Sequence, residues 1–219
     1  MLRKIRLTLA VCFFLCITGL FLDFTGTLHT WLGWMAKIQF LPAVLALNVG
    51  IVIALVVLTL VFGRAYCSVI CPLGVMQDLF AWFGKRGKKR KYHYSYSPEK
   101  KGWRYGFLAL FLLILVAGIG SGAALLAPYS SFGRIVSNLL APLYGWGNNL
   151  LAYWAERADS YAFYETDVWL KSLPTFLIAV ITVVVLFVLA WRNGRTYCNT
   201  ICPVGTVLGF ISRYSIFNR

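Results

Sequence analysis

Charged residues are scarce in this sequence of 219 residues. Asp, Glu, Lys and Arg make up 13% of it, and only seven residues are acidic. Apolar residues make up 60%, which departs from the usual balance of a soluble domain. Several apolar runs approach the roughly 20 residues that cross a bilayer as a helix. The composition therefore predicts an integral membrane protein with a single membrane domain over residues 1–219.

The shortage of acidic residues leaves a formal net charge of +14. In a soluble protein this charge would suggest binding to nucleic acid. In a membrane protein, Lys and Arg gather in the cytoplasmic loops and hold that side of the protein in place. We therefore expect contact with membrane lipid and no nucleic-acid partner.

The sequence also lacks a glycine-rich phosphate-binding loop, which argues against a nucleotide-dependent enzyme. It has only two histidines, His29 and His93. The topology derived below puts them on opposite sides of the membrane, so they cannot ligate one haem together. His29 follows a short outer turn and is interpreted as an interface residue. Deprotonation of a quinol is the other role open to it.

Four apolar stretches predict four membrane helices, so the expected fold is all-α, an integral membrane four-helix protein. They are about Ile5–Leu22, Leu41–Phe62, Trp103–Leu126 and Leu173–Trp191. Basic residues precede the first stretch, as they do in a signal peptide. Its apolar run is long, however, and no small-x-small cleavage site clearly follows it before Asp23, which favours a retained anchor.

Lys and Arg are divided unevenly between the two sides of these helices. If the amino terminus is cytoplasmic, 17 of the 21 lie on the cytoplasmic side and four on the outer side. The positive-inside rule then places both termini in the cytoplasm. We expect a multi-pass protein of the inner (cytoplasmic) membrane.

A twelve-residue pattern occurs twice on the predicted cytoplasmic face. It reads GRAYCSVICPLG over Gly63–Gly74 and GRTYCNTICPVG over Gly194–Gly205. Each copy follows an apolar stretch that opens with Leu-Pro, at Leu41 and at Leu173. The chain is therefore predicted to be internally duplicated, with two halves that each end in a cytoplasmic Cys-x3-Cys-Pro motif.

The predicted repeats cover about residues 1–84 and 103–210, and a basic cytoplasmic loop over 85–102 joins them. Because both copies have the same orientation, we expect a pseudo-two-fold axis along the membrane normal. Such an axis would bring the two cysteine motifs together.

Four of the six cysteines lie in the two motifs, and they are the predicted metal and cofactor ligands: Cys67, Cys71, Cys198 and Cys202. Four thiolates suit an iron–sulfur cluster or a structural zinc ion. Two membrane dithiol pairs are a further alternative, although thiol oxidoreductases usually have a two-residue gap between their cysteines. The spacing alone leaves these three alternatives open.

Residues beside the cysteines suit such a site. Pro72 and Pro203 are expected to keep the preceding cysteines out of helical geometry. Gly74 and Gly205 would let the chain turn close to the sulfurs. The arginines of the two motifs, Arg64 and Arg195, would place positive charge near the thiolates.

The other two cysteines, Cys12 and Cys16, lie four residues apart in the first predicted helix. That spacing puts them on one helix face. We interpret them as small packing residues, with a membrane-embedded thiol pair as the alternative.

Two segments are predicted to lie on the outer side. Ser131–Leu140 is expected to form a short helix that stops before Pro142. Asn148–Tyr164 contains several aromatic residues and is expected to lie along the membrane interface. Its aromatic residues would alternatively form a wall of a quinone pocket.

The two motifs, together with APYSSFGRI over Ala127–Ile135, resemble the NosR/NapH-type family of polytopic iron–sulfur membrane proteins. The resemblance covers nearly the whole chain. It implies a 4Fe-4S cluster on the motif cysteines and electron transfer between a quinol pool and redox partner proteins or subunits. It also implies an electron-transfer component rather than an autonomous enzyme.

One feature departs from the family. Its members commonly continue into a ferredoxin-like segment, Cys-x-x-Cys-x-x-Cys-x-x-x-Cys-Pro. No such segment is present before Arg219. The expectation is either a short member or the membrane domain of a longer protein.

Overall fold

The fold is built from helices. The computed structural model describes residues 2–23, 26–63, 65–86, 101–157 and 172–216. Within these ranges every regular element is helical and no strand occurs. The predicted all-α class is confirmed.

The elements of the first half precede residue 87. They are α1 (Leu2–Leu22), α2 (Thr27–Lys37), α3 (Phe40–Leu45), α4 (Val49–Phe62), the π-helix η1 (Tyr66–Ile70) and α5 (Pro72–Arg86). The elements of the second half begin after residue 100. They are α6 (Lys101–Val116), α7 (Gly120–Leu126), α8 (Pro128–Ile135), the π-helix η2 (Val136–Leu140), α9 (Ala141–Arg157), α10 (Leu173–Asn193), α11 (Thr196–Thr200), α12 (Pro203–Ile211) and the 3-10 helix η3 (Ser212–Tyr214).

Two helices in the described part of the chain are long and apolar enough to cross a membrane. They are Lys4–Leu22 within α1 and Leu173–Trp191 within α10. Only 11% and 17% of their most apolar windows are buried in the protein, which is far less than in the core helix of a soluble protein. The structure therefore leaves most of their apolar surface open to a surrounding medium.

The other two predicted membrane helices are each interrupted, so four continuous membrane helices are not confirmed. The first is interrupted between Leu45 and Val49, and the second between Val116 and Gly120. At each break a residue adopts a positive φ, 52° at Leu47 and 72° at Gly118. The shorter helices that remain do not reach the length of a membrane span on their own.

Both breaks have the same hydrogen bonds. The N–H of Asn48 donates to the carbonyl of Ala43 at 2.9 Å, and that of Ile119 donates to the carbonyl of Ile114 at 3.2 Å. A bond across five residues, with a left-handed residue between, is the Schellman motif that ends helices. Glycine adopts this conformation readily, whereas Leu47 does so at a cost.

The predicted stop before Pro142 was wrong. α8, η2 and α9 follow one another without a break, and Pro142 is the second residue of α9. Proline normally breaks a helix because its ring clashes with the preceding turn. Here that turn is the wider π-turn η2, and π-turns occur as insertions within α-helices.

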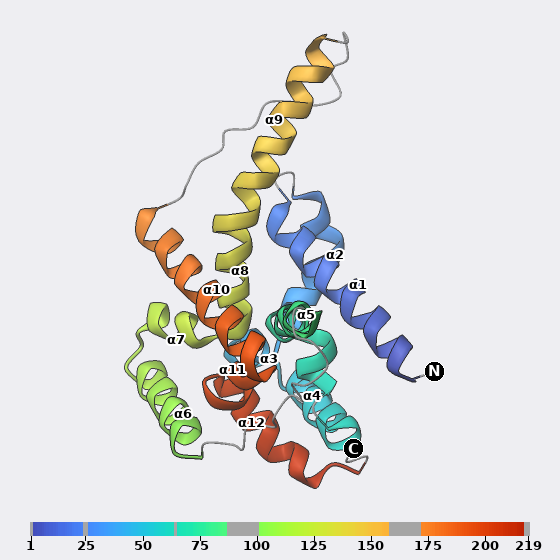
Figure 1. Cartoon of the computed structure of the whole chain (residues 1–219). Helices are drawn as coiled ribbons and strands as arrows, with labels where there is room; N and C mark the ends of the chain where they lie inside the picture. The colour runs from blue at the N-terminus through green and yellow to red at the C-terminus, as the bar shows by residue number, and fades with distance from the viewer. Residues whose placement is uncertain (1, 24–25, 64, 87–100, 158–171, 217–219) are drawn as a thin grey trace.

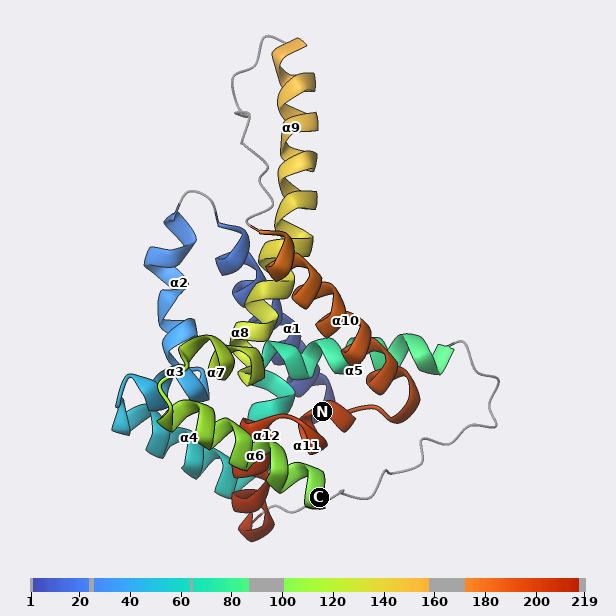
Figure 2. The ribbon, with the colours of Figure 1, turned by 90° about the vertical axis from the view of Figure 1, so that its left-hand side faces the viewer.

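Figures 1 and 2 show how the elements are arranged. α9 leads away from the rest of the protein, and α10 runs back toward the centre, where it packs against α5 and α8. α1 packs against η1, and α12 packs against α4 and α6. The two cysteine motifs therefore lie where elements of both halves meet.

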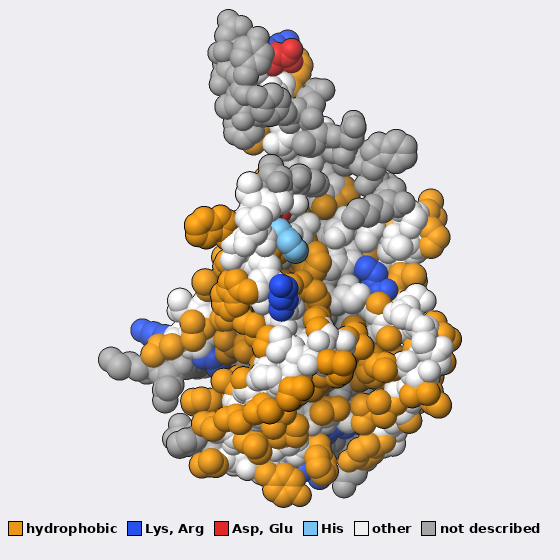
Figure 3. Space-filling model, turned by 180° about the vertical axis from the view of Figure 1, so that it is seen from behind, with side chains coloured by type: hydrophobic (Ala, Val, Ile, Leu, Met, Phe, Trp, Pro, Cys, Tyr) orange, Lys and Arg blue, Asp and Glu red, His pale blue; other side chains and the backbone are white. Residues whose placement is uncertain are grey.

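The segment expected on the outer side is instead part of this centre. Phe132, Ile135 and Val136 are at most 4% exposed and share one buried cluster with Cys67 and Cys71. Their apolar side chains account for the difference, because they lose contact with water when α8 packs against α5 and α10. The surface is also strongly apolar, and Figure 3 shows such side chains over most of one face below α9.

Candidate iron–sulfur site

Each motif begins with a glycine whose backbone conformation requires the flexibility of glycine. Gly63 has φ 65° and ψ −132°, and Gly194 has φ 72° and ψ −121°. Residues with a side chain rarely adopt this region. The two glycines end α4 and α10 in the same way and direct the chain into the cysteine segments.

The second cysteine of each motif stands directly before a helix. Cys71 has φ −78° and ψ 112°, and Cys202 has φ −72° and ψ 118°. These extended angles confirm that the following prolines keep both cysteines out of helical geometry. Pro72 and Pro203 then open α5 and α12. The positive end of a helix dipole and its unpaired N–H groups both stabilise a thiolate.

Backbone N–H groups do bond to these sulfurs. The N–H of Gly205 donates to Sγ of Cys202 at 3.4 Å. The N–H groups of Leu73 and Gly74 oppose the rise in the pKa of Cys71 by bonding to its thiol. Hydrogen bonds to cysteine sulfur are one means by which proteins set the properties of a bound metal centre.

Gly74 and Gly205 bring the backbone very close to the first cysteine of each motif. A Cβ atom at Gly74 would lie 2.1 Å from the carbonyl oxygen of Cys67, and one at Gly205 would lie 2.2 Å from that of Cys198. Both glycines lie inside helices and neither has a positive φ, so close approach explains them rather than the turn we expected.

The structure brings the four motif cysteines into one neighbourhood. Three are buried, at 9% exposure for Cys67 and 3% each for Cys71 and Cys202, and Cys198 is half-buried. Burial, and then repulsion from Cys198, Cys71 and Cys67, raises the pKa of Cys202 well above its usual value. The thiol of Cys202 therefore lies within electrostatic range of the other three.

The same effects act on the other thiols. Burial, followed by repulsion from Cys198, raises the pKa of Cys71 to about 12. Burial, followed by repulsion from Cys67, raises the pKa of Cys198 to about 12. Four thiols held together in apolar surroundings ionise with difficulty unless a positive centre compensates their charge.

The side chain of Gln77 on α5 reaches the second motif. It is fully buried, and its Nε2 donates to Sγ of Cys198 at 3.3 Å. The neighbouring Asp78 accepts a bond from Nε of Arg195 at 2.7 Å and a second from its terminal nitrogen. Sequence reasoning missed both residues, because spacing along one helix does not reveal what that helix faces.

A tyrosine of the first motif is held by the two residues at the start of α3. The hydroxyl of Tyr66 donates to Oε1 of Gln39 at 3.0 Å and accepts from the N–H of Phe40 at 2.9 Å. Nε2 of Gln39 in turn donates to the carbonyl of Ile70 at 3.2 Å. Gln39 therefore positions the backbone of the first motif without bonding to a sulfur.

The segment around Arg134 faces the second motif. Burial, and then repulsion from Cys202, raises the pKa of Tyr197, whereas the charge of Arg134 lowers it. Arg134 belongs to the Ala127–Ile135 segment that was expected on the outer side. This segment lies beside the cysteine site, next to the second motif.

Other candidate residues are placed elsewhere. Cys12 and Cys16 lie in α1, exposed and half-buried respectively. His29 is exposed on α2, and its N–H donates to Asp23. Arg64 and His93 are outside the described residues, as is most of the 85–102 loop.

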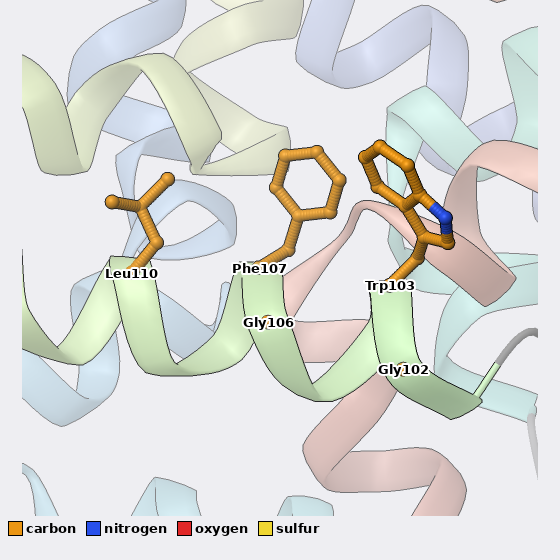
Figure 4. Close-up of a pocket in the computed structure, with 5 residues that line it drawn as sticks. All are labelled: Gly102, Trp103, Gly106, Phe107 and Leu110. Carbon is orange, nitrogen blue, oxygen red and sulfur yellow. The ribbon is translucent and has the colours of Figure 1, made fainter.

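Two hollows lie near α6. A cavity of about 220 Å³ is lined by Arg104, Tyr105, Leu108, Thr206, Val207, Phe210, Ile211 and Arg213, so it adjoins the second motif. A groove of about 420 Å³ is formed by Gly102, Trp103, Gly106, Phe107 and Leu110. Figure 4 shows its aromatic side chains projecting from one side of α6, and no motif residue lines it.

The site does not have the geometry of a single bound ion. Among the described residues, no three His, Cys, Asp or Glu side chains lie close enough to hold one metal ion. A zinc ion would need all its sulfurs about 2.3 Å from one point. A cluster holds its thiolates farther apart, because several iron and sulfide atoms lie between them.

Two segments of the chain match a known family model. The model of the 4Fe-4S binding domain matches over residues 44–91 and again over 173–219. Both motif segments are therefore similar to the 4Fe-4S binding domain. The resemblance to polytopic iron–sulfur proteins is thereby confirmed, and each 4Fe-4S binding segment contains one Cys-x3-Cys-Pro motif.

Two curated relatives share most of the chain. It is 28% identical to the ferredoxin-type protein NapH of Haemophilus influenzae, over 80% of the chain and 47% of NapH. It is 24% identical to YccM of Escherichia coli, provisionally named an electron transport protein, over 81% of the chain and 42% of YccM. The chain spans less than half the length of both relatives. No solved structure matches it significantly.

The chain is therefore related to electron-transport iron–sulfur proteins. The two 4Fe-4S binding segments include every residue of the site found above except Gln39, Arg134 and the residues around them.

Proposed function

We propose that this protein is a membrane-bound electron-transfer component. A 4Fe-4S cluster is held by Cys67, Cys71, Cys198 and Cys202, and electrons pass between the quinol pool and redox partner proteins. The observation that carries this proposal is that both motif segments match the 4Fe-4S binding domain and that Cys67, Cys71 and Cys202 share one buried cluster, with Cys198 bonded to α5 beside them.

The residues present fit such a cluster. Four cysteines converge, two of them at helix N-termini, and N–H groups bond to sulfurs of both motifs. The guanidinium of Arg195 lies close enough to oppose the rise in the pKa of Cys71 and Cys198. When bound, the cluster accepts and releases single electrons. The chain's own residues hold it, shield it from water and supply donors to its sulfurs.

Two alternatives fit less well. A thiol–disulfide relay needs a thiolate that attacks at neutral pH, and the raised pKa values of Cys71 and Cys198 disfavour that form. A zinc-stabilised anchor needs ligands around one ion, which the described residues do not provide.

The membrane setting is also a proposal. The strongly exposed apolar faces of α1 and α10 support insertion, and the uneven division of Lys and Arg supports cytoplasmic termini in an inner membrane. We infer that α3–α4 and α6–α7 form two further passes as broken helices. Broken helices occur at membrane depth where protein covers the interrupted backbone.

An internal duplication, with repeats over 1–84 and 103–210, is supported by matched contacts. α5, which follows the first motif, packs against α10, and α12, which follows the second, packs against α4. α1 contacts η1 as α6 contacts α11. The two halves differ in three places: α3–α4 is interrupted where α10 is continuous, α6–α7 is interrupted where α1 is continuous, and η1 is a π-turn where α11 is an α-turn.

Quinol as the donor is supported by the cavity beside the second motif. Its apolar walls include Phe210 and Leu108, and it contains two arginines. This mixture suits a ring with polar carbonyl groups and an apolar tail. Thr206 lines the cavity and directly follows Gly205, so a ligand there would lie beside the proposed cluster.

The names of the relatives support protein partners in electron transport. Contact with membrane lipid follows from the proposed setting. We propose that the chain works with redox partner proteins or subunits rather than as an enzyme by itself.

Metal and sulfide analysis of the purified protein tests the proposal. We expect iron and acid-labile sulfide at about four of each per chain, with a broad brown absorbance that dithionite bleaches. Stoichiometric zinc in a colourless protein would support the anchor instead. A metal-free protein with reducible disulfides would support the thiol relay.

Reporter fusions test the topology. A fusion after Arg90 should report the cytoplasm, and a fusion after Arg157 should report the outer side, because of the excess of Lys and Arg around the first position. An outer signal from the Arg90 fusion would reverse the orientation. It would also remove the cysteine motifs from the cytoplasmic face.

A further inference from the structure

The two halves of the site are unequal in one respect. If the motifs are aligned cysteine to cysteine, Gln77 and Asp78 on α5 correspond to Leu208 and Gly209 on α12. Both α12 residues are buried and neither has a polar side chain. α5 therefore has two polar side chains at positions where α12 has none.

Gln77 contacts a ligand sulfur directly. Its side chain is 0% exposed, and Nε2 donates to Sγ of Cys198 at 3.3 Å. Among the described residues, its buried Oε1 atom has no hydrogen-bond partner. Burying an unpaired amide oxygen is costly, whereas the amide nitrogen is paired with the sulfur. The burial of Gln77 thus costs stability, which points to a role at the sulfur rather than in folding.

Asp78 acts on the same side of the site through Arg195. The carboxylate holds the guanidinium with two bonds, in a pair that joins α5 to the second motif. Arg195 lies within electrostatic range of Cys198 and Cys67. Asp78 therefore both positions this positive charge and partly neutralises it.

We propose that Gln77 and Asp78 set the reduction potential of the cluster from the Cys198 side, with opposite signs. This inference rests on the proposed function. The amide N–H of Gln77 stabilises the added negative charge of the reduced state and so raises the potential. The carboxylate of Asp78 offsets the charge of Arg195 and so lowers it.

Redox titration of the purified, cluster-loaded protein, followed by electron paramagnetic resonance, tests this. Gln77→Leu introduces the residue that the second half has at this position. At a fixed applied potential it should lower the ratio of reduced to oxidised protein by about tenfold, a shift of about 59 mV for one electron. Gln77→Glu keeps the shape but replaces the donor, and it should shift the potential in the same direction.

Asp78→Asn should shift the potential upward. The shift should be smaller than that of Gln77→Leu, because the side chains of Arg195 and Asp78 are 34% and 46% exposed and water screens the pair. A purely structural role for the two residues predicts loss of cluster in both variants and no opposite shifts. Cluster-loaded variants with unchanged potentials would overturn the inference.

Thr182→Val is the control. Thr182 lies in α10 and in neither motif, and its hydroxyl donates to the carbonyl of Ile178 at 2.7 Å. Removing this hydrogen bond should leave the potential unchanged. An equal shift in this variant would overturn the inference. Iron content separates the two proposals: wild-type protein without iron would contradict the cluster itself, before any potential is compared.

Discussion

Cys71→Ser and Cys202→Ser should each remove the bound cluster and abolish electron transfer, while the protein still inserts into the membrane. Both thiols are 3% exposed at the start of helices, where Pro72 and Pro203 fix their direction. The ligands act as a set, because losing one leaves an incomplete coordination shell open to water. Iron and sulfide per chain should fall to near background, and reduction by a quinol analogue should cease.

Cys12→Ser and Cys16→Ser are the matched controls, since the chemical change is identical and only the position differs. Both residues lie in α1, and Cys12 is exposed. Iron content and electron transfer should match those of the unmodified protein. If the Cys12 variant loses iron while the Cys71 variant keeps it, the assignment of the site to the repeated motif is wrong.

Much of the helical fold could be predicted, because long apolar runs have few alternatives to helix in a membrane. The interruption of two of these runs could be predicted only in part. Gly118 is a residue that commonly ends helices, so the break after Val116 had a signal in the sequence. Leu47 adopts the same left-handed conformation without being glycine. Its side chain is 84% exposed, so packing does not impose that conformation, and the backbone hydrogen bonds of the Schellman turn hold it there.

The candidate site shows the same division. The four cysteines could be predicted as ligands, because their pattern occurs twice with the same flanking Gly, Arg, Tyr and Pro. Gln77 could not be recognised, because its role depends on a contact with Cys198, which lies 121 residues later in the sequence. A signal did exist for Asp78, since it is an acidic residue on a side predicted to be strongly basic. Comparing the helices that follow the two motifs would have shown both residues as departures from the repeat.

Arg134 shows what a topology prediction leaves out. The segment Ala127–Ile135 was recognised as a family feature but placed on the outer side, because topology assigned it to an outer connection. The structure packs α8 against α5 and α10 instead, so that Arg134 acts on Tyr197. A topology prediction assigns each segment to a side, and it cannot show a segment that reaches inward from that side.

Gly74→Ala and Gly205→Ala should prevent the motif from closing. A Cβ at either position would lie 2.1–2.2 Å from the carbonyl oxygen of the first cysteine of the same motif. That neighbour is backbone, so relief requires moving Cys67 or Cys198 itself, and with it a ligand. Overpacking of this kind typically costs about 1–3 kcal/mol and at times more. It opposes the gain of up to about 1 kcal/mol that alanine brings to a helix.

The expected result is a loss of both cluster and stability. A cost of about 3 kcal/mol less a gain of about 1 kcal/mol leaves a net cost of about 2 kcal/mol. The thermal midpoint should then fall by roughly 4–8 °C, since 1 kcal/mol corresponds to about 2–4 °C for a chain of this size. Gly106→Ala in α6 and Gly147→Ala in α9 are the controls, because a Cβ at either position meets nothing within 4 Å. They should leave iron content unchanged and raise the midpoint slightly. Equal behaviour of all four variants would mean that the close approach of each glycine to its cysteine does not hold the site together.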